Sequence, residues 1–461
     1  MGDAPAESSY LGSLYNLGAS ALKYGYDTVS SYVGYDGGDL DIVDPNAEGS
    51  QEVKEIDAND ERQSFFVGAN FSKYVGMDVT SLLSVPVWIM EPFSVTQKVT
   101  EIMEYSELMD LANDAEDPFM RQAYMVAYLV SPFSCIERTY KPFNPILGET
   151  FEYTVPGKFR FFSEQVSHHP PICAAHGESE SDKWTYDIVS APKSKFLGNS
   201  VEIYPLGRTR IKLHTPNETF ILRTPHAKAN NIVVGSTWID VFGSLAVKCV
   251  ESGVEAHVDF TQCGWFGAGR YEFKGYIVDA DGKKVMLVSG KWNSHCDAVR
   301  CDADGNPADG AETHRLWESN PKPEDPKYKF TQFAKDLNTV PAGAPEPLPS
   351  DARRRPDRFA LMVGDSVKAG EQKSVLEDRQ RAEKRERTKR EEPWEPRWFV
   401  AVSAEEVVNY DFEAVNDIGH WKAKPGFFQQ QAERAGAKNE DVEGAGFCPW
   451  QFPELPTGEA A

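Results

Sequence analysis

The sequence predicts a β-rich α+β protein whose largest part is an antiparallel β-barrel that is closed or nearly closed. From residue 150 to about 301, short alternating runs such as 210–214 and 284–288 are separated by turn signals such as Asp281-Gly282. About a dozen such strands follow one another without a helical interruption, which favours a barrel. A barrel of more than about eight strands is too wide for side chains alone to fill, so we expect an apolar ligand inside it.

The composition limits the classes of partner. The chain of 461 residues is 41% hydrophobic and 12% aromatic, so it can bury a sizeable core in one large domain or in about two to three ordinary ones. Its formal net charge of -23 argues against nucleic acid as the main partner and against broad electrostatic adhesion to anionic membranes. Any phosphate must therefore be recognised locally, in a pocket.

Cysteine usage and the chain start indicate a compartment. The seven cysteines show no paired spacing, which suits a reducing cytosol and predicts neither a disulfide framework nor a metal site. The N-terminus lacks the basic region of a secretory signal, and no apolar run approaches the roughly 18 residues of a membrane span. We therefore expect a cytoplasmic protein without a metal or another cofactor.

Residues 1–35 are expected to form an amphipathic helix interrupted by glycines. Leu11, Tyr15, Leu22 and Tyr26 recur at helical spacing and share one face, while the other face is mostly uncharged. Such a helix binds membranes weakly through its apolar side, or it folds down over an opening in its own protein. We favour a mobile lid that closes over a ligand; the alternative is a frayed helix packed on the core. Residues 36–63 then form an acidic linker.

Helical patterns flank the predicted barrel. After an extended apolar segment at 76–92, residues 94–112 and 117–131 have the spacing of two helices that cover the core. Residues 302–358 are rich in Asp, Pro, Gly and Ala and are expected to form a long surface connection. A strongly charged helix follows at 374–390.

A stiff histidine pair follows a strand-like run at 159–162. It lies in the sequence Glu-Gln-Val-Ser-His-His-Pro-Pro, residues 164–171. The two prolines fix their own backbone angles and push the residue before them out of the helical region, so the segment presents His168 and His169 at a fixed place. The alternative is a strand-to-turn corner whose histidines only satisfy local hydrogen bonds.

A second rigid loop, at 138–150, contains two prolines and presents Lys141 and Asn144. The three donors of a lysine and the amide of an asparagine suit phosphate or inositol oxygens. The alternative is an ordinary turn with a solvated lysine.

A third group of candidates lies on the charged helix. Lys373, Glu377 and Arg381 are spaced four apart, and each step of four drifts only about 40° around a helix, so the three share one side. The alternative is a solvated helix with salt bridges between its own side chains.

Together these motifs resemble the oxysterol-binding-protein family of lipid-transfer proteins. The match comprises EQVSHHPP, a K-P-x-N-P-x-L-G-E segment that begins at Lys141, the K-x-x-x-E-x-x-x-R triplet, and a W-x-P-x-W-F segment that begins at Trp394. The resemblance implies a large incomplete antiparallel β-barrel around an apolar tunnel, with an N-terminal lid helix and flanking helices. The lipid-binding domain would span 64–425, with a helical part at 64–135, the barrel at 136–301, and a C-terminal wrap with helices at 302–425, including a covering helix near 410–417. Residues 426–461 would form a tail.

The same resemblance implies a function. Such domains bind phosphatidylinositol 4-phosphate, with its acyl chains in the tunnel and its head group at the mouth, and exchange it for a sterol or phosphatidylserine. The implied head-group residues are Lys141, Asn144, His168, His169, Lys373, Glu377 and Arg381. Cationic donors from three segments would hold the phosphate, an Arg can grip it bidentately, and Glu377 would orient a neighbouring cation or accept from an inositol hydroxyl. The protein would be peripheral on Golgi or endoplasmic reticulum membranes, touching them transiently, and would not be an enzyme.

Two rival functions differ in class. The histidines with Glu164, Glu377 and Asp240 could be drawn as a metal hydrolase of phospholipids, but the chain lacks the H-E-x-x-H and G-x-S-x-G patterns. The other rival is a lipid sensor that binds the same lipids and reports occupancy to a partner without bulk transport. The sequence hardly separates sensing from carrying.

Overall fold

The computed structural model describes residues 74–80, 85–325, 327–341, 343–403, 406, 419–434, 436 and 442–450. The predicted lid, with Leu11, Tyr15, Leu22 and Tyr26, lies outside the described residues, as do the acidic linker and the covering helix near 410–417. Among the helices of the described part, none combines the length and the apolarity needed to cross a membrane.

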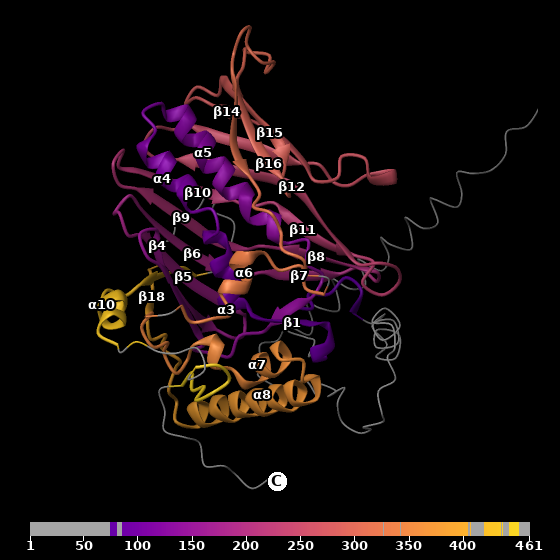
Figure 1. The fold of residues 1–461 in the computed structure, drawn as a ribbon, viewed down its shortest axis with the longest axis vertical. Helices are drawn as coiled ribbons and strands as arrows, with labels where there is room; N and C mark the ends of the chain where they lie inside the picture. The colour runs from indigo at the N-terminus through magenta and orange to yellow at the C-terminus, as the bar shows by residue number, and fades with distance from the viewer. Residues whose placement is uncertain are drawn as a thin grey trace, which may run out of the picture.

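A single sheet of 15 strands dominates the fold (Figure 1). Its main path runs in the order β17-β16-β15-β14-β13-β12-β10-β9-β6-β5-β4-β3, and the ends of this path do not pair with each other. Every pairing within this sheet is antiparallel. The prediction of a large, incomplete antiparallel barrel is therefore confirmed. The strands are β3 (Thr150–Val155), β4 (Phe159–Ser167), β5 (Ile172–Ser179), β6 (Trp184–Ser190), β7 (Lys193–Phe196), β8 (Ser200–Tyr204), β9 (Gly207–Leu213), β10 (Glu218–Arg223), β11 (His226–Asn230), β12 (Trp238–Cys249), β13 (Glu255–Phe260), β14 (Glu272–Val278), β15 (Lys284–Lys291), β16 (His295–Arg300) and β17 (Thr313–Glu318).

The strands form because apolar residues recur at every second position. In β13, Ala256, Val258 and Phe260 are buried, whereas His257 and Asp259 between them are exposed. The buried face joins a core cluster that spans β3 to β17 and the helices packed on the sheet. One face of the sheet therefore carries the apolar interior, as the alternating pattern predicts.

A side branch extends the sheet beyond β10. The strand β12 pairs with β10 along its second half, through Phe220 and Cys249, and with β11 along its first half, through Asn230 and Trp238. Strand β11 in turn pairs with β8, and β8 with β7. The turns of this branch lie at the end of the sheet where β12 begins.

The helical segment before the barrel differs in part from prediction. Helix α5 (Pro118–Val130) matches the expected 117–131 helix, because Asp117 caps it and Pro118 occupies its first turn. The expected 94–112 helix is instead three pieces: α3 (Val95–Lys98), the 3-10 helix η3 (Val99–Met103) and α4 (Glu107–Asp114). Its polar residues are buried with partners of their own, such as Gln97 on the carbonyl of Leu337, so no single apolar stripe sets one helical register. Upstream lie η2 (Val87–Ile89) and β1 (Met90–Ser94), which pairs with β2 (Lys141–Phe143).

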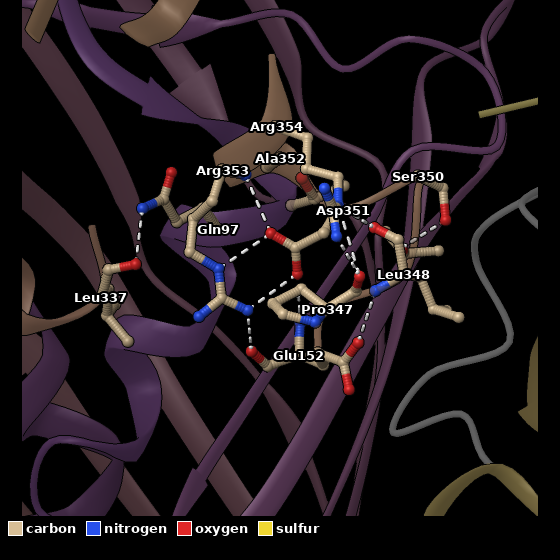
Figure 2. Close-up of polar contacts among 12 residues, drawn as sticks. Gln97, Glu152, Leu337, Pro347, Leu348, Ser350, Asp351, Ala352, Arg353 and Arg354 are labelled. Carbon is tan, nitrogen blue, oxygen red and sulfur yellow. Dashed lines mark hydrogen bonds and ion pairs between the residues drawn. The ribbon is translucent and has the colours of Figure 1, made fainter. Parts of the chain in front are cut away.

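The expectation of a surface connection over 302–358 is wrong. Strand β17 within it forms an edge of the sheet, and residues 347–355 enter the interior (Figure 2). Arg353 is buried, pairs with both oxygens of Asp351 at 2.8 and 2.9 Å, and donates to the carbonyl of Glu152 at 2.8 Å. The burial of this segment cannot be recognised locally, because it packs on β3, and Glu152 lies 201 residues away from Arg353 in the sequence.

The C-terminal part of the chain supplies the remaining helices and strands. They are α6 (Gln332–Asp336), η6 (Ala352–Arg354), α7 (Pro356–Met362), α8 (Ser366–Lys389), β18 (Phe399–Ala401), β19 (Trp421–Ala423) and α10 (Phe427–Ala432). Figure 1 shows α4 and α5 across one face of the sheet, and α7 and α8 together at one end. Helix α8 contains the predicted charged helix and begins earlier, where the side chain of Asp365 caps it. Within the predicted tail, Phe427 stacks on Phe162 at 3.9 Å between ring centroids.

Candidate functional site

A cleft of about 1270 Å³ lies where the two proline-flanked loops meet α8 and the segment before β18. Six of the seven predicted site residues line it: Asn144, His168, His169, Lys373, Glu377 and Arg381. The seventh, Lys141, donates from its Nζ to Oδ1 of Asn144. The structure thus brings together three segments of the chain: the loop of Lys141 and Asn144, the turn of the histidine pair, and α8. More than 200 residues lie between the histidine pair and Lys373 on α8.

An arginine supports the loop that carries Lys141 and Asn144. Arg355 Nη1 donates to the carbonyl oxygen of Asn144 at 2.9 Å. Burial, followed by the positive charge of Lys373, lowers the pKa of Lys141 to about 8 against the opposite pull of Glu377. Lysines crowded in this way favour an anionic ligand, because such a ligand relieves their mutual repulsion.

The histidine pair lies on the turn after β4. The two rings meet edge to face with 4.6 Å between their centroids, and His169 is the more exposed. Burial, followed by the charge of His169, lowers the pKa of His168 to about 4, and burial with Lys384 lowers the pKa of His169. Nδ1 of His168 is buried and has no hydrogen-bond partner among the described residues. The pair is therefore neutral near pH 7 and has an unused polar atom at the cleft.

The three candidates on α8 differ in their pairing. Lys373 Nζ lies 2.7 Å from Glu377 Oε1, the arrangement expected if Glu377 orients that lysine. Arg381 instead pairs with Asp378 at 2.8 Å and is largely exposed at the cleft edge. An exposed pair of this kind contributes little stability, so its guanidinium can turn to an anion at small cost.

Buried carboxyl and amide groups hold the walls of the cleft. Gln380 Oε1 accepts from the backbone N–H of Leu147 at 2.7 Å, which ties the loop of Lys141 and Asn144 to α8. Glu164 in β4 accepts from the backbone N–H groups of Arg397 and Trp398 at 2.7 and 2.8 Å. Burial raises the pKa of Glu164 to about 7. This carboxyl group therefore fixes the W-x-P-x-W-F segment as one wall.

Sequence reasoning missed several cations that line the same cleft, among them Lys384 and Lys424. Lys384 is exposed, and its charge acts on both imidazoles of the histidine pair. Its spacing of seven residues from Glu377 and eleven from Lys373 places it on the same face of α8 and could have identified it. No comparable pattern marks Lys424, which follows β19.

The residues of the hydrolase alternative are engaged elsewhere. The oxygens of Glu164 accept the two backbone N–H groups described above, and Asp240 accepts from the backbone N–H of Cys263 at 2.9 Å. Within the described ranges, no group of three or more His, Cys, Asp or Glu side chains is arranged to hold a metal ion.

An incomplete antiparallel barrel with a cation-lined cleft at its end defines a lipid-binding class of protein. Residues 68–432 match the model of the family described as oxysterol-binding protein, and the chain belongs to this family. The oxysterol-binding protein-related protein 3B of Arabidopsis thaliana is 39% identical over 457 residues, which cover 98% of this chain and 96% of that protein.

Two solved structures have the same fold. The Osh1 ORD domain in complex with ergosterol has a TM-score of 0.70 and 29% identity, and the match covers 86% of this chain and 93% of that chain. The Osh3 ORD of Saccharomyces cerevisiae in complex with PI(4)P has a TM-score of 0.65 and 28% identity, with 80% and 92% covered.

Proposed function

We propose that this protein binds phosphatidylinositol 4-phosphate with its head group in the cleft, and exchanges it for a sterol or phosphatidylserine between membranes. The observation that carries the proposal is the convergence of Lys141 and Asn144, the histidine pair and the α8 cations on one cleft. The complexes of related domains with PI(4)P and with ergosterol support both kinds of ligand.

The head group is held by charge-assisted bonds from three segments. Lys141, Lys373 and Arg381 donate to the phosphate oxygens, and the imidazoles of His168 and His169 donate from the third segment. Each such bond contributes about 1.5–3 kcal/mol. Glu377 keeps Lys373 in place rather than meeting the phosphate. The local cluster of cations offsets the net charge of -23, because the donors are close together and partly removed from water.

Exchange follows if both lipids use one interior. The acyl chains of the phosphoinositide and the second lipid then compete for the apolar side of the sheet, so each lipid displaces the other at a membrane. The N-terminal lid would cover the occupied interior during transit. The protein would act at the surface of Golgi or endoplasmic reticulum membranes.

Lipid occupancy of the purified protein tests the binding step. The protein is incubated with liposomes that contain phosphatidylinositol 4-phosphate, sterol and phosphatidylserine, and the bound lipid is identified by native mass spectrometry. We expect one phosphoinositide per chain in the wild type, and a much lower phosphoinositide occupancy in the His168→Ala/His169→Ala variant, which retains the second lipid. His257→Ala is the control, because His257 lies exposed on β13 and pairs with Glu255. Equal phosphoinositide binding by both proteins would overturn the head-group assignment.

Transfer between two liposome populations separates exchange from sensing. We expect sterol or phosphatidylserine transfer to accelerate when the acceptor liposomes contain phosphatidylinositol 4-phosphate. A protein that loads lipid but moves none in this assay is a sensor.

A further inference from the structure

The cleft extends well beyond the residues assigned to the head group. Its volume of about 1270 Å³ exceeds the roughly 300–1,000 Å³ of a pocket that takes one drug-sized ligand. The head-group candidates on α8 run from Lys373 to Arg381, about 12 Å of helix, but the residues of α8 that line the cleft continue to Lys389, about 24 Å from Lys373. We call the part of the cleft beside residues 384–389 the distal groove.

The α8 wall of the distal groove is cationic. Four positively charged side chains contribute to it: Lys384, Arg385, Arg387 and Lys389. Two of them pair with glutamates of the same helix, whereas Lys384 and Arg385 are exposed and form no ion pair with another described residue. The carboxyl groups of Glu392 and Glu395 also line the cleft, so cations outnumber anions here by two to one. In a protein of net charge -23, such a wall favours an acidic occupant.

A second wall of the cleft carries an unpaired strand edge. Strand β18 lines the cleft with all three of its residues, Phe399, Val400 and Ala401. Val402 N–H donates to the carbonyl of His420 at 2.9 Å, and in an antiparallel ladder only alternate residues bond the partner strand. The N–H and C=O groups of Phe399 and Ala401 therefore point away from β19. No described strand pairs with that edge, and no described group bonds to these four backbone groups.

A free strand edge beside a cationic wall selects an extended acidic chain. A phosphate group accepts hydrogen bonds but donates few, so it leaves the carbonyl groups of the edge unused. An added strand uses donors and acceptors alike, and its side chains alternate between two faces. Trp394 and Trp421, which also line the cleft, offer apolar surface. The distal groove therefore suits a strand with carboxylates on one face and apolar side chains on the other.

The chain itself contains a segment with this pattern. The acidic linker, residues 36–63, has ten acidic and two basic residues, and residues 39–44 within it read Asp-Leu-Asp-Ile-Val-Asp. Acidic and apolar residues alternate from 39 to 42, which is the period of a strand with one acidic and one apolar face. The linker lies outside the described residues, so its amino-acid sequence alone identifies it as the matching occupant.

The linker is tethered close enough to reach the distal groove. The described chain passes the histidine pair at Thr80, which lines a small cavity together with both imidazoles. Asp44 and Thr80 are 36 residues apart, and an extended chain spans up to about 3.3 Å per residue. This length is several times the 24 Å of the α8 wall, so the tether does not restrict the contact.

We propose that the acidic linker occupies the distal groove, with residues 39–44 added to the free edge of β18 and their carboxylates beside the cations of α8. The carboxylates then lie next to the head-group candidates and repel an anionic ligand. The apparent affinity for the phosphoinositide is reduced by the fraction of chains whose groove is free. This effect on affinity rests on the proposed function, whereas the contact between linker and groove does not.

Zero-length cross-linking of the full chain, without lipid, tests the contact. A carbodiimide joins a carboxylate to a lysine amine only where the two groups meet. We expect cross-links from residues 39–44 to Lys384 or Lys389, with a yield that falls several-fold at high salt, because salt screens exposed charges. Cross-links of this segment only to lysines outside the cleft, or no cross-links, would overturn the proposal.

A mixture of unlabelled and isotope-labelled protein shows which chain supplies the linker. We expect each cross-linked peptide pair to come from one chain, either fully labelled or fully unlabelled. Pairs that combine a labelled with an unlabelled peptide would assign the distal groove to the linker of a second copy, which would overturn an intramolecular contact.

A proline at the free edge tests the strand addition. Ala401→Pro removes a donor of this edge that bonds no described group, so the cross-links should fall several-fold. Ala401→Val is the matched control at the same exposed position, because it keeps the N–H, and it should cross-link as the wild type does. Equal yields from the two variants would overturn the addition of the linker to β18.

The affinity for a soluble short-chain phosphatidylinositol 4-phosphate tests the competition. Asp39→Asn/Asp41→Asn/Asp44→Asn should bind it about three- to tenfold more tightly than the wild type, because the groove is no longer occupied. The charge-matched control is Asp281→Asn/Asp304→Asn/Asp309→Asn. Its three carboxylates are exposed on the β14–β15 and β16–β17 turns and do not line the cleft. Equal affinities of the two triple variants would overturn the competition.

The two readouts separate this inference from the proposed function. If the cross-links form but the wild type does not bind the short-chain phosphoinositide, the head-group assignment fails while the linker contact stands. If the wild type binds the ligand but its linker forms no cross-links to α8, the linker contact alone fails.

Discussion

Arg355 and Glu149 form a buried ion pair, with 2.8 Å between Nη1 and Oε2, although they are 206 residues apart in the chain. The other edge of the same guanidinium grips Asp357 at 2.6 and 3.0 Å. Arg355 also donates to the carbonyl oxygen of Asn144 and so supports the loop of Lys141 and Asn144 at the cleft. The geometry of the candidate site therefore depends on a buried ion-pair network, and Arg355 is also one of the residues that line the cleft.

Replacing Arg355 by methionine should strongly destabilise the protein. The change leaves Glu149 and Asp357 buried without their cation, and removal of one partner of a buried pair costs about 3–5 kcal/mol. Urea unfolding of the purified variant measures the loss. Arg385→Met, on the exposed side of α8, should change the free energy of unfolding by less than about 0.5 kcal/mol. Similar values for the two variants would show that the buried network is not required for stability.

Gly148→Ala should destabilise the protein more than Gly157→Ala. Both glycines have a left-handed backbone, with φ of 78° and 77°, so both variants carry the same strain. A Cβ at Gly148 would lie 2.7 Å from the ring of Trp394, whereas nothing lies within 4 Å of one at Gly157. We expect a further loss of about 1–3 kcal/mol at Gly148 from this overlap, measured by urea unfolding. An equal loss of unfolding free energy at both positions would mean that the Trp394 side chain moves to admit the methyl group without destabilising the protein.

Much of the candidate site could be predicted because its parts are local. Prolines on both sides of Asn144 and after His169 exclude helix, and a spacing of four fixes one face of α8 wherever the helix packs. The alternating pattern likewise predicts strands without knowledge of their partners. These features need only a few neighbouring residues, so the sequence was sufficient.

The remainder depends on distant contacts. Residues 351–358 contain four arginines and were expected at the surface, but Arg353, Arg355 and Arg358 are buried, each with partners from other segments. The same holds for Gln97 in the broken 94–112 helix. A charge or amide is indistinguishable from a solvated one until the fold supplies its partner, which is why local reasoning failed here.

Lys384→Gln should weaken phosphoinositide binding without changing the binding of an uncharged sterol. Lys384 is exposed in the cleft and acts on both imidazoles, so it adds to the positive potential at the head group. Loss of one such charge should raise the dissociation constant about three- to tenfold. Titration with soluble short-chain phosphatidylinositol 4-phosphate at two salt concentrations measures the change.

Lys389→Gln is the control for this prediction. Lys389 also lines the cleft on α8, but it pairs with Glu386 at 2.8 Å. Its removal should therefore have a smaller effect on affinity. If both variants bind as the wild type does, the α8 cations beyond Arg381 contribute nothing to recognition.

The histidine pair should make phosphoinositide binding depend on pH. In the free protein the pKa of His168 is about 4 and that of His169 lies below its usual value, so both rings are neutral near pH 7. A phosphate beside them favours the charged imidazolium and raises both pKa values, so binding takes up protons. Proton uptake means that affinity rises as pH falls from about 7 toward 5. The lipid phosphate titrates near pH 6 and opposes this trend, so the comparison must isolate the histidines.

Calorimetric titrations of the wild type and of His168→Ala/His169→Ala, each in two buffers of different ionisation enthalpy, provide that comparison. The phosphate contributes equally to both proteins, and the difference in protons taken up belongs to the imidazoles. We expect the wild type to take up more protons than the variant at pH 6, and its affinity to fall more steeply as pH rises. Equal proton uptake would mean that the two rings stay neutral in the complex and act only as hydrogen-bond donors through one ring nitrogen each.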